Sequence, residues 1–203
     1  CTVPFYATSS EQQIQYMVND AQIRFIFVGE QEQYDKAHRI FPLCPTLERV
    51  IIFDDSVRIS SHDPNALYFE DFLKLGEDLP RQTELEKRWK EANNDDLCNI
   101  LYTSGTTGES KGVMLTYGQY GAAFVANDKC VPVGEKDRVI CFLPFTHIFE
   151  RAWAILCLSE GAQLIINTYP NEIQNSMRET NPTCMSSVPR FWEKVYQAVN
   201  ENI

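Results

Sequence analysis

The sequence has 203 residues, of which 18 are Lys or Arg and 28 are Asp or Glu, so the formal net charge is −10, and 44% of the residues are hydrophobic. This size and composition are typical of a folded protein with a sizeable core and argue against an intrinsically disordered chain. The acidic balance, without a dense stripe of Lys and Arg, argues against a nucleic-acid partner but leaves room for one nucleotide in a local pocket.

The first 53 residues alternate between helical and strand patterns. Ser9 and Ser10 are each followed three positions later by a glutamine, which is the capping-box spacing of a helix start. Short apolar runs over 23–28 and 49–53 predict two strands, and a helical pattern over 31–40 lies between them. This alternation predicts parallel strands joined by helical crossovers, which is the α/β class.

Residues 54–96 form an acidic segment with 12 acidic and 6 basic residues, a net charge of 6 − 12 = −6. Helical patterns over 68–75 and 84–92 carry mostly charged surfaces. We expect this segment to be a solvated excursion on the surface, without chemistry of its own.

Residues 97–203 continue the alternation. Predicted strands cover 97–102, 113–115, 138–143, 163–166 and 183–186, and predicted helices begin after Thr116, cover 148–158 and 172–178, and begin again at Pro189. The helix over 148–158 is apolar on nearly all sides, which predicts burial. The last helix is expected to bury a stripe made of Phe191, Trp192, Val195, Tyr196 and Val199.

The loop between the strands at 97–102 and 113–115 carries the strongest chemical signal. Its sequence, YTSGTTGESKG over 102–112, combines glycines, hydroxyl side chains and one lysine. Glycines bring backbone N–H groups close to a ligand, hydroxyls add donors, and Lys111 adds a compact positive charge, a combination that suits a polyphosphate. The spacing excludes a Walker A loop and a dinucleotide G-x-G-x-x-G loop, because the glycines fall at positions 105, 108 and 112 and Gly follows the lysine.

Four motifs resemble the adenylate-forming superfamily of AMP-binding enzymes, which includes acyl- and aryl-CoA synthetases, luciferases and the adenylation domains of peptide synthetases. The string YTSGTTGESKGV resembles the phosphate-loop signature of that superfamily, and LPFTHIFER over 143–151 resembles the L-P-x-x-H-x-x-E-R segment of its long-chain acyl-CoA synthetase branch. VPFYATSS over 3–10 and SVPRFWEKVY over 187–196 are weaker matches to the same family. The resemblance therefore spans residues 3–196.

The resemblance implies an enzyme that joins a fatty acid to the α-phosphate of ATP, releases pyrophosphate, and passes the acyl group to the thiol of coenzyme A. It implies that the β- and γ-phosphates are wrapped by Thr103, Ser104, Gly105, Thr106, Thr107, Gly108 and Lys111. Mg²⁺ would assist at the phosphates, and no residue of the chain is assigned as its ligand. Lys111 and His147 are the candidate catalytic residues, and His147 would lie near the acyl carboxylate.

Other residues of the LPFTHIFER segment allow two interpretations. Glu150 and Arg151 are interpreted as a structural pair at a helix end. Phe145, Phe149 and Trp153 either border an acyl channel or pack in the core, since aromatic residues at helical spacing are usually part of a core. The sequence leaves both interpretations of these aromatic residues open.

The resemblance is incomplete. The Y-G-x-T-E segment that holds adenine and Mg²⁺ in the family has no counterpart, because Tyr117-Gly118 continues as Gln-Tyr. The ribose-binding Asp, the hinge and the small C-terminal domain with its lysine have no counterpart either. We therefore expect an interior segment of a longer ligase, inactive when isolated. Two alternatives stay open: a non-catalytic nucleotide- or protein-binding module, and an aryl-CoA or acyl-AMP ligase of the same superfamily.

The fold expected from the family is α/β, with two mainly parallel sheets and packed helices. Residues 1–126 would form the first sheet with its helices, including the phosphate loop and the acidic excursion at 54–96. Residues 127–203 would begin a second, similar sheet, and the turn at 132–134 marks the boundary.

The seven cysteines are scattered without a C-x-x-C pair, and the three histidines are isolated in the sequence. This pattern predicts free thiols in a reducing compartment and no metal site. No segment approaches the ~20 apolar residues that cross a bilayer. We expect a cytoplasmic protein whose partners are fatty acid, ATP and coenzyme A. Peripheral membrane contact is suggested only by the insoluble substrate, and the oligomeric state stays open.

Overall fold

The structure is a computed structural model that describes residues 1–77, 81–103 and 110–201. It divides into two compact units, Cys1–Gly118 and Gln119–Ile203. The boundary expected at 126/127 falls inside helix α5 (Tyr117–Asp128). Among the described residues, no helix has the length and apolar character needed to cross a membrane.

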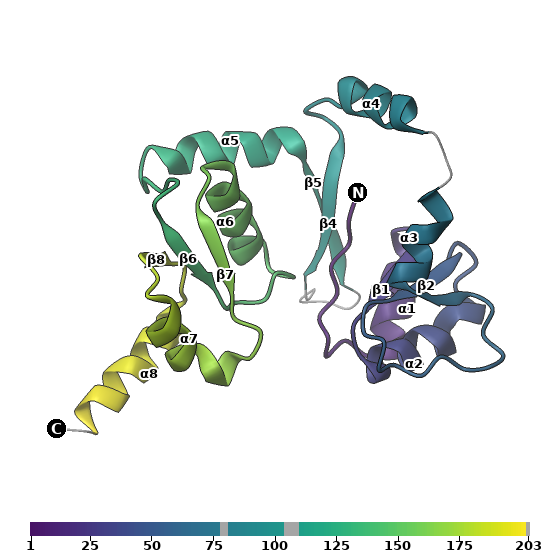
Figure 1. The fold of residues 1–203 in the computed structure, drawn as a ribbon, viewed down its shortest axis with the longest axis horizontal. Coiled ribbons are helices and arrows are strands. Elements are labelled where there is room, and N and C mark those ends of the chain that lie inside the picture. The colour runs from purple at the N-terminus through teal and green to yellow at the C-terminus, as the bar shows by residue number, and fades with distance from the viewer. Residues whose placement is uncertain (78–80, 104–109, 202–203) are drawn as a thin grey trace. The chain divides into compact units, whose positions relative to one another are not determined.

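Both units are built from helices and strands (Figure 1). The first unit contains α1 (Glu11–Asp20), β1 (Phe25–Val28), α2 (Gln31–Ile40), the 3₁₀ turn η1 (Phe41–Leu43), β2 (Arg49–Ile52), β3 (Ala66–Tyr68), α3 (Phe69–Glu77), α4 (Gln82–Glu91), β4 (Leu97–Thr103) and β5 (Lys111–Thr116). Helix α5 begins in the first unit, and the second contains β6 (Arg138–Cys141), α6 (Ile148–Ser159), β7 (Gln163–Ile166), η2 (Pro170–Glu172), α7 (Ile173–Thr180), β8 (Cys184–Met185) and α8 (Pro189–Asn200).

The first unit is built on a parallel sheet of order β1-β2-β3. Its register places Phe25 opposite Arg49 and Val50 opposite Ala66. The core of this unit combines residues of β1 and β2, the apolar faces of α1 and α2, and three residues outside these elements: Ile14, Val18, Ile26, Val28, Tyr34, Ala37, Ile40, Cys44, Leu47, Val50, Ile52 and Val57. The capping box predicted at the start of α1 is confirmed for Ser10, whose hydroxyl accepts from the backbone N of Gln13.

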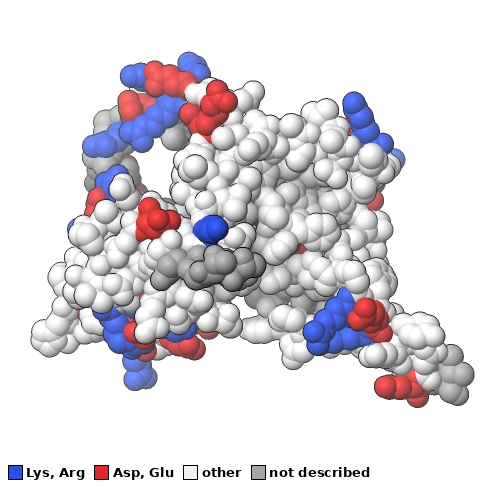
Figure 2. Space-filling view, turned by 180° about the vertical axis from the view of Figure 1, so that it is seen from behind, with Lys and Arg blue, Asp and Glu red and all other residues white. Residues whose placement is uncertain are grey.

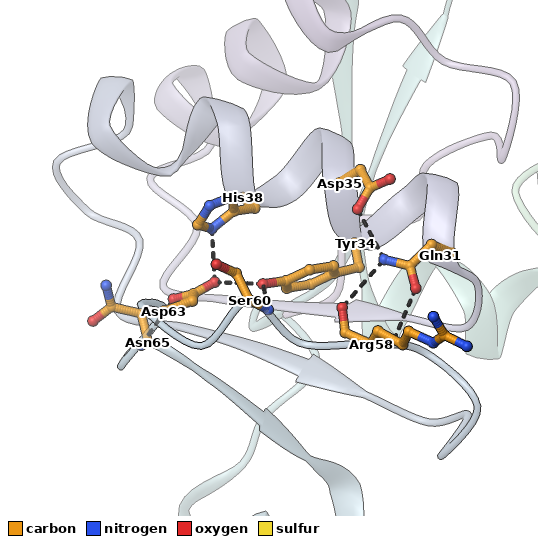
Figure 3. Close-up of polar contacts among 8 residues, drawn as sticks. All are labelled: Gln31, Tyr34, Asp35, His38, Arg58, Ser60, Asp63 and Asn65. Atoms are coloured by element: carbon orange, nitrogen blue, oxygen red, sulfur yellow. Dashed lines mark hydrogen bonds and ion pairs between the residues drawn. The ribbon is translucent and has the colours of Figure 1, made fainter.

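The acidic segment at 54–96 differs partly from the expected solvated excursion. Strand β3 was not predicted there, because its three residues are too few to show a period. The loop before β3 is fastened to α2 (Figure 3). Tyr34 Oη donates to Asp63 Oδ2 over 3.0 Å, and His38 Nδ1 lies 2.8 Å from the same oxygen. The Asp63 side chain is only 5% exposed, so this acidic residue is a structural anchor.

Helix α4 fits the expected solvated surface. None of its residues is buried. Figure 2 shows Lys and Arg side chains intermixed with Asp and Glu side chains over this helix, at the upper left of the view. Exposed pairs such as Glu84 and Arg88, with Arg88 Nε 3.0 Å from the carboxylate, contribute little to stability.

Strands β4 and β5 form a separate antiparallel hairpin. This corrects the expectation of a single parallel sheet in residues 1–126. The physical reason is the connection of seven residues at 104–110, which is too short for the crossover that parallel strands require. The N-terminal segment adds to the hairpin, because Thr2 N donates to Cys98 O and Ile100 N donates to Thr2 O.

The second unit contains a parallel sheet of order β7-β6-β8. Its core is formed by Val133, Val139, Cys141, Ala154, Cys157 and Ala162. Helix α6 is buried on one face only, since Phe149 is 47% and Leu158 59% exposed, so the prediction of burial on nearly all sides was too broad.

The predicted burial of α8 was also wrong. Trp192 is 54% and Tyr196 70% exposed. Among the described residues, the ring contact from α8 to the rest of its unit is that of Phe191, whose centroid lies 5.1 Å from that of Phe142. The helix has the expected apolar stripe, but no described element of its unit covers it.

Candidate functional site

The predicted phosphate loop connects the two strands of the hairpin. Thr103, the last residue of β4, pairs with Lys111, the first residue of β5, and Tyr102 pairs with Gly112. The predicted ligands Ser104, Gly105, Thr106, Thr107 and Gly108 lie outside the described residues. Cross-strand pairing brings the two ends of the loop to within about 5.5 Å of each other. The hairpin therefore places the hydroxyl of Thr103 and the exposed Lys111 on the same end of one rigid element.

Tyr102 anchors the start of the loop to helix α1. Its hydroxyl donates to Asp20 Oδ2 over 2.5 Å, and its ring packs edge-on against Tyr16 with centroids 6.3 Å apart. Burial raises the pKa of Tyr102, and the neighbouring Asp20 carboxylate raises it further, so the phenol stays protonated and keeps donating. This anchor joins residues 82 positions apart in the sequence.

Gly112 has a steric role at the other side of the loop. A Cβ atom at this position would lie 2.9 Å from Ile100 Cγ2 and 3.2 Å from Tyr102 Cζ. Carbon atoms in contact normally stay about 3.5–4.0 Å apart. The glycine that follows the lysine therefore allows the two strands to pack closely beside the loop.

His147 lies at the carboxyl edge of the sheet in the second unit, after strand β6. It is the N-cap of α6, and its Nδ1 accepts from the backbone N of Phe149 over 3.2 Å. In the neutral ring this hydrogen bond assigns the proton to Nε2, which is then a donor suited to a carboxylate oxygen. The residue is exposed. Ligands of open α/β sheets bind at this edge of the strands, so the position fits the predicted role. Lys111 belongs to the first unit and His147 to the second.

Glu150 and Arg151 do not form the predicted pair with each other among the ion pairs of the described residues. Glu150 is fully buried, and it accepts from Phe142 N over 3.0 Å and from Ser186 Oγ over 2.5 Å. Arg151 Nε donates to the carbonyl oxygen of Phe145 over 2.8 Å. Both residues make structural contacts, as expected. These contacts do not join the two residues to each other; they hold the segment 142–147, which leads to α6.

The core interpretation fits two of the three aromatic residues, and an acyl channel stays a prediction. Phe145 and Trp153 pack against the core of the second unit, whereas Phe149 is exposed. Two buried polar atoms, Thr146 Oγ1 and Trp153 Nε1, have no hydrogen-bond partner among the described residues. Buried polar atoms of this kind are rare in folded proteins. They lie on either side of His147 in the sequence.

The cysteines are free thiols, as predicted. Burial raises the pKa of Cys141 to about 12, and the Glu150 carboxylate contributes to that shift. Burial likewise raises the pKa of Cys157 to about 12. Thiols of this kind are poor nucleophiles and poor metal ligands at neutral pH. In residues 1–77, 81–103 and 110–201, no group of three or more His, Cys, Asp and Glu side chains could hold a metal ion.

A cavity of about 770 Å³ lies in the first unit, between the N-terminal segment and β1. Phe5, Ile26 and Ile100 are among its lining residues. Of the predicted site residues that the structure describes, Thr103, Lys111 and His147, none lines it. The candidate site residues of the first unit are at the hairpin end, and His147 is the candidate of the second unit.

Sequence comparison supports the assignment that the motifs predicted. The family model described as "AMP-binding enzyme" matches residues 1–202. The human long-chain-fatty-acid–CoA ligase ACSBG1 is 30% identical over 97% of this chain and 28% of its own length. The long-chain-fatty-acid–CoA ligase 1 of Saccharomyces cerevisiae is 35% identical over 70% of this chain and 21% of its own length.

Structural comparison supports the fold. A long-chain-fatty-acid–CoA ligase from Archaeoglobus fulgidus matches with a TM-score of 0.69, 17% identity and coverage of 98% of this chain and 37% of that chain. The anthranilate CoA ligase AuaEII, in complex with anthranoyl-AMP, matches with a TM-score of 0.70, 21% identity and coverage of 89% and 34%. These likenesses confirm the predicted α/β class with mainly parallel sheets.

The chain spans a little over a quarter of the length of the first curated relatives that it matches. The match of the family model covers both units and all four motifs. The chain belongs to the AMP-binding enzyme family.

Proposed function

We propose that the protein carrying this chain is an ATP-dependent, AMP-forming long-chain fatty-acid–CoA ligase. The observation that carries the proposal is the phosphate loop of an AMP-binding enzyme, held at both ends by one hairpin. The ligase names of its relatives and the LPFTHIFER segment favour a long-chain acid over other carboxylic acids.

The first reaction joins a carboxylate to a nucleotide. An oxygen of the fatty-acid carboxylate attacks the α-phosphorus of ATP, a new oxygen–phosphorus bond forms, and pyrophosphate leaves with the electron pair of the broken bond. The positive charge of Lys111 and the hydroxyl of Thr103 would stabilise the charge that gathers on the departing pyrophosphate. The loop residues Ser104–Gly108 would add further donors. Because β4 and β5 pair Thr103 with Lys111 before the ligand arrives, these two residues need little rearrangement during the reaction.

The fatty acid would be oriented by His147, which belongs to the second unit. The Nε2–H of His147 would donate to one carboxylate oxygen and leave the other free to attack. The thiol of coenzyme A would then attack the carbonyl carbon of the acyl-adenylate, the thioester would form, and AMP would leave. Mg²⁺, arriving with ATP, would supply additional charge neutralisation at the phosphates.

Pyrophosphate exchange tests this proposal on the full-length protein encoded by the gene. Radiolabelled pyrophosphate should enter ATP when a long-chain fatty acid is present. Lys111→Ala should lower this exchange by about 100-fold or more, because it removes a preorganised charge at the leaving group. Lys129→Ala, which removes an exposed lysine on the second unit, is the matched control and should leave the rate unchanged.

Other outcomes separate the alternatives. Exchange that occurs only with aryl or amino acids would contradict the fatty-acid assignment and keep the family. Micromolar ATP binding by calorimetry, with no adenylate formed from any acid, would favour a non-catalytic nucleotide-binding module.

We also propose a cytoplasmic location with peripheral contact to membranes. The seven free thiols support a reducing compartment. The insoluble substrate is the reason for the membrane contact. Cell fractionation, with a salt or carbonate wash of the membrane fraction, tests both parts.

A further inference from the structure

We propose that Glu150 is a positioning residue: its buried carboxylate joins the carboxyl ends of β6 and β8 to the first turn of α6, and so holds His147 at the edge of the sheet. This inference rests on the proposed function, because the role of His147 comes from it. Glu150 does not contact the substrate in this proposal. It acts through the segment 142–147.

The carboxylate joins three elements of one unit. Phe142, which donates its backbone N–H over 3.0 Å, is the first residue after β6. Ser186, which donates its hydroxyl over 2.5 Å, is the first residue after β8. These two strands are neighbours in the sheet, and the residue after each strand donates to a different oxygen of the carboxylate. One side chain therefore fixes where the segment 142–147 leaves the sheet.

The usual role of a glutamate at this helix position does not explain the arrangement. Glu150 is the third residue of α6, where a glutamate typically accepts from the backbone N–H of the N-cap. Here the N–H of the N-cap residue, His147, donates instead to the carbonyl oxygen of Pro144 over 3.0 Å. The carboxylate is turned inward and is 0% exposed. Glu150 lies in the first turn of the helix, next to the partial positive charge of the helix N-terminus.

The adjacent residue fixes the middle of the same segment. Arg151 donates to the carbonyl oxygen of Phe145 over 2.8 Å. The segment is thus held at its start by Glu150, at its middle by Arg151, and at its end by the helix itself. A displacement of His147 would have to break one of these contacts. Because a shift of about 1 Å at a reacting group costs about 100-fold in rate, such rigidity matters for the chemistry.

The test compares two substitutions at Glu150 in the full-length protein. Glu150→Gln keeps an oxygen that accepts from Phe142 N and an amide that can donate to Ser186 Oγ, so it keeps the geometry without the charge. Glu150→Ala removes both contacts. Glu179→Ala, an exposed glutamate on α7 of the same unit, is the matched control. The measurements are pyrophosphate exchange at varied fatty acid and varied ATP, and amide hydrogen exchange over residues 142–147.

We expect Glu150→Ala to lower kcat/KM for the fatty acid by about 100-fold while the KM for ATP stays unchanged. Its amide hydrogens over 142–147 should exchange faster than those of the wild type. Glu150→Gln and the control should resemble the wild type in both measurements.

Three results would overturn the proposal. The first is equal loss of activity in Glu150→Gln and Glu150→Ala, which would assign the effect to the charge. The second is unchanged hydrogen exchange in Glu150→Ala. The third is a parallel change of both KM values, which indicates a general structural defect.

Two further outcomes keep the test decisive. If Glu150→Ala does not fold, Ser186→Ala removes one of the two contacts, and faster exchange over 142–147 supports the proposal whereas unchanged exchange overturns it. If the wild type shows no pyrophosphate exchange with any acid, the proposed function fails, and hydrogen exchange alone decides whether Glu150 holds the segment.

Discussion

Replacing Gly112 with alanine tests whether close packing shapes the stem of the phosphate loop. The added methyl group would point at the opposite strand, 2.9 Å from Ile100 Cγ2 and 3.2 Å from Tyr102 Cζ. The Tyr102 ring cannot retreat freely, because its hydroxyl is bonded to Asp20. The substitution therefore forces the side chains of Ile100 and Tyr102 to move where they are already closely packed.

The magnitude follows from these distances. Relative to a carbon–carbon contact of about 3.5 Å, Ile100 must move by about 0.6 Å and Tyr102 by about 0.3 Å. Overpacking of this kind typically costs about 1–3 kcal/mol. Alanine restricts the unfolded chain, which offsets about 0.5–1 kcal/mol. We expect the free energy of unfolding to fall by about 1–2 kcal/mol.

The assay is urea unfolding followed by far-ultraviolet circular dichroism. Gly76→Ala is the control, because a methyl group there meets no described atom within 4 Å and lies in helix α3 of the same unit. It should raise the free energy of unfolding by up to about 1 kcal/mol, since alanine favours helix over glycine. If both variants gain stability, the close approach at Gly112 is not a constraint and the reasoning is refuted.

Three other perturbations have defined outcomes. Tyr102→Phe should lose about 1 kcal/mol of stability at pH 8, because the hydrogen bond to Asp20 is removed. Since the pKa of Tyr102 is raised in the folded state, the advantage of the wild type is full below the tyrosine pKa of about 10 and should shrink in urea unfolding at pH 11. In labelling with iodoacetamide read by mass spectrometry, the exposed Cys130 should react well before the buried Cys157, and equal rates would contradict the buried position. Asp63→Ala should cost about 2–4 kcal/mol in urea unfolding, because Tyr34 Oη and the backbone N of Asn65 lose their acceptor and His38 loses its partner; a loss under about 0.5 kcal/mol would count against the anchor.

Local features of the fold and site were predictable from the sequence. The capping box at Ser10 depends on residues three positions apart, and the helix over 31–40 shows its periodicity within ten residues. The loop at 102–112 stands out in the sequence for the same reason, because its glycines, hydroxyls and Lys111 are contiguous, and its binding of phosphates stays a prediction. Such features can be predicted because they depend on residues that are close together in the sequence.

Contacts between distant segments were not predictable. Glu150 and Ser186 are 36 positions apart, and no periodicity or spacing links them. A glutamate at the third position of a helix is typical of capping, so the local pattern favoured a different role from the one observed. The histidine at position 38 looked isolated, but it meets Asp63 across 25 residues. These contacts depend on the topology of the sheets.

For the amphipathic helices, the sequence predicts which face is apolar but not whether that face is buried. The apolar stripe of α8 exists, yet Trp192 and Tyr196 on it are exposed. Periodicity identifies which face of a helix is apolar. It does not identify which element covers that face.

The antiparallel hairpin has a consequence for the order of folding. Its strands pair residues no more than 19 positions apart, from Leu97 with Thr116 to Thr103 with Lys111. Closing so short a loop costs little chain entropy, whereas β6 and β8 must bring together residues 45 positions apart, Val139 and Cys184. The hairpin can therefore form from local sequence as the chain is synthesised, before the parallel sheet that follows it is complete. The part of the protein that would hold the nucleotide's phosphates is then among the first to take shape.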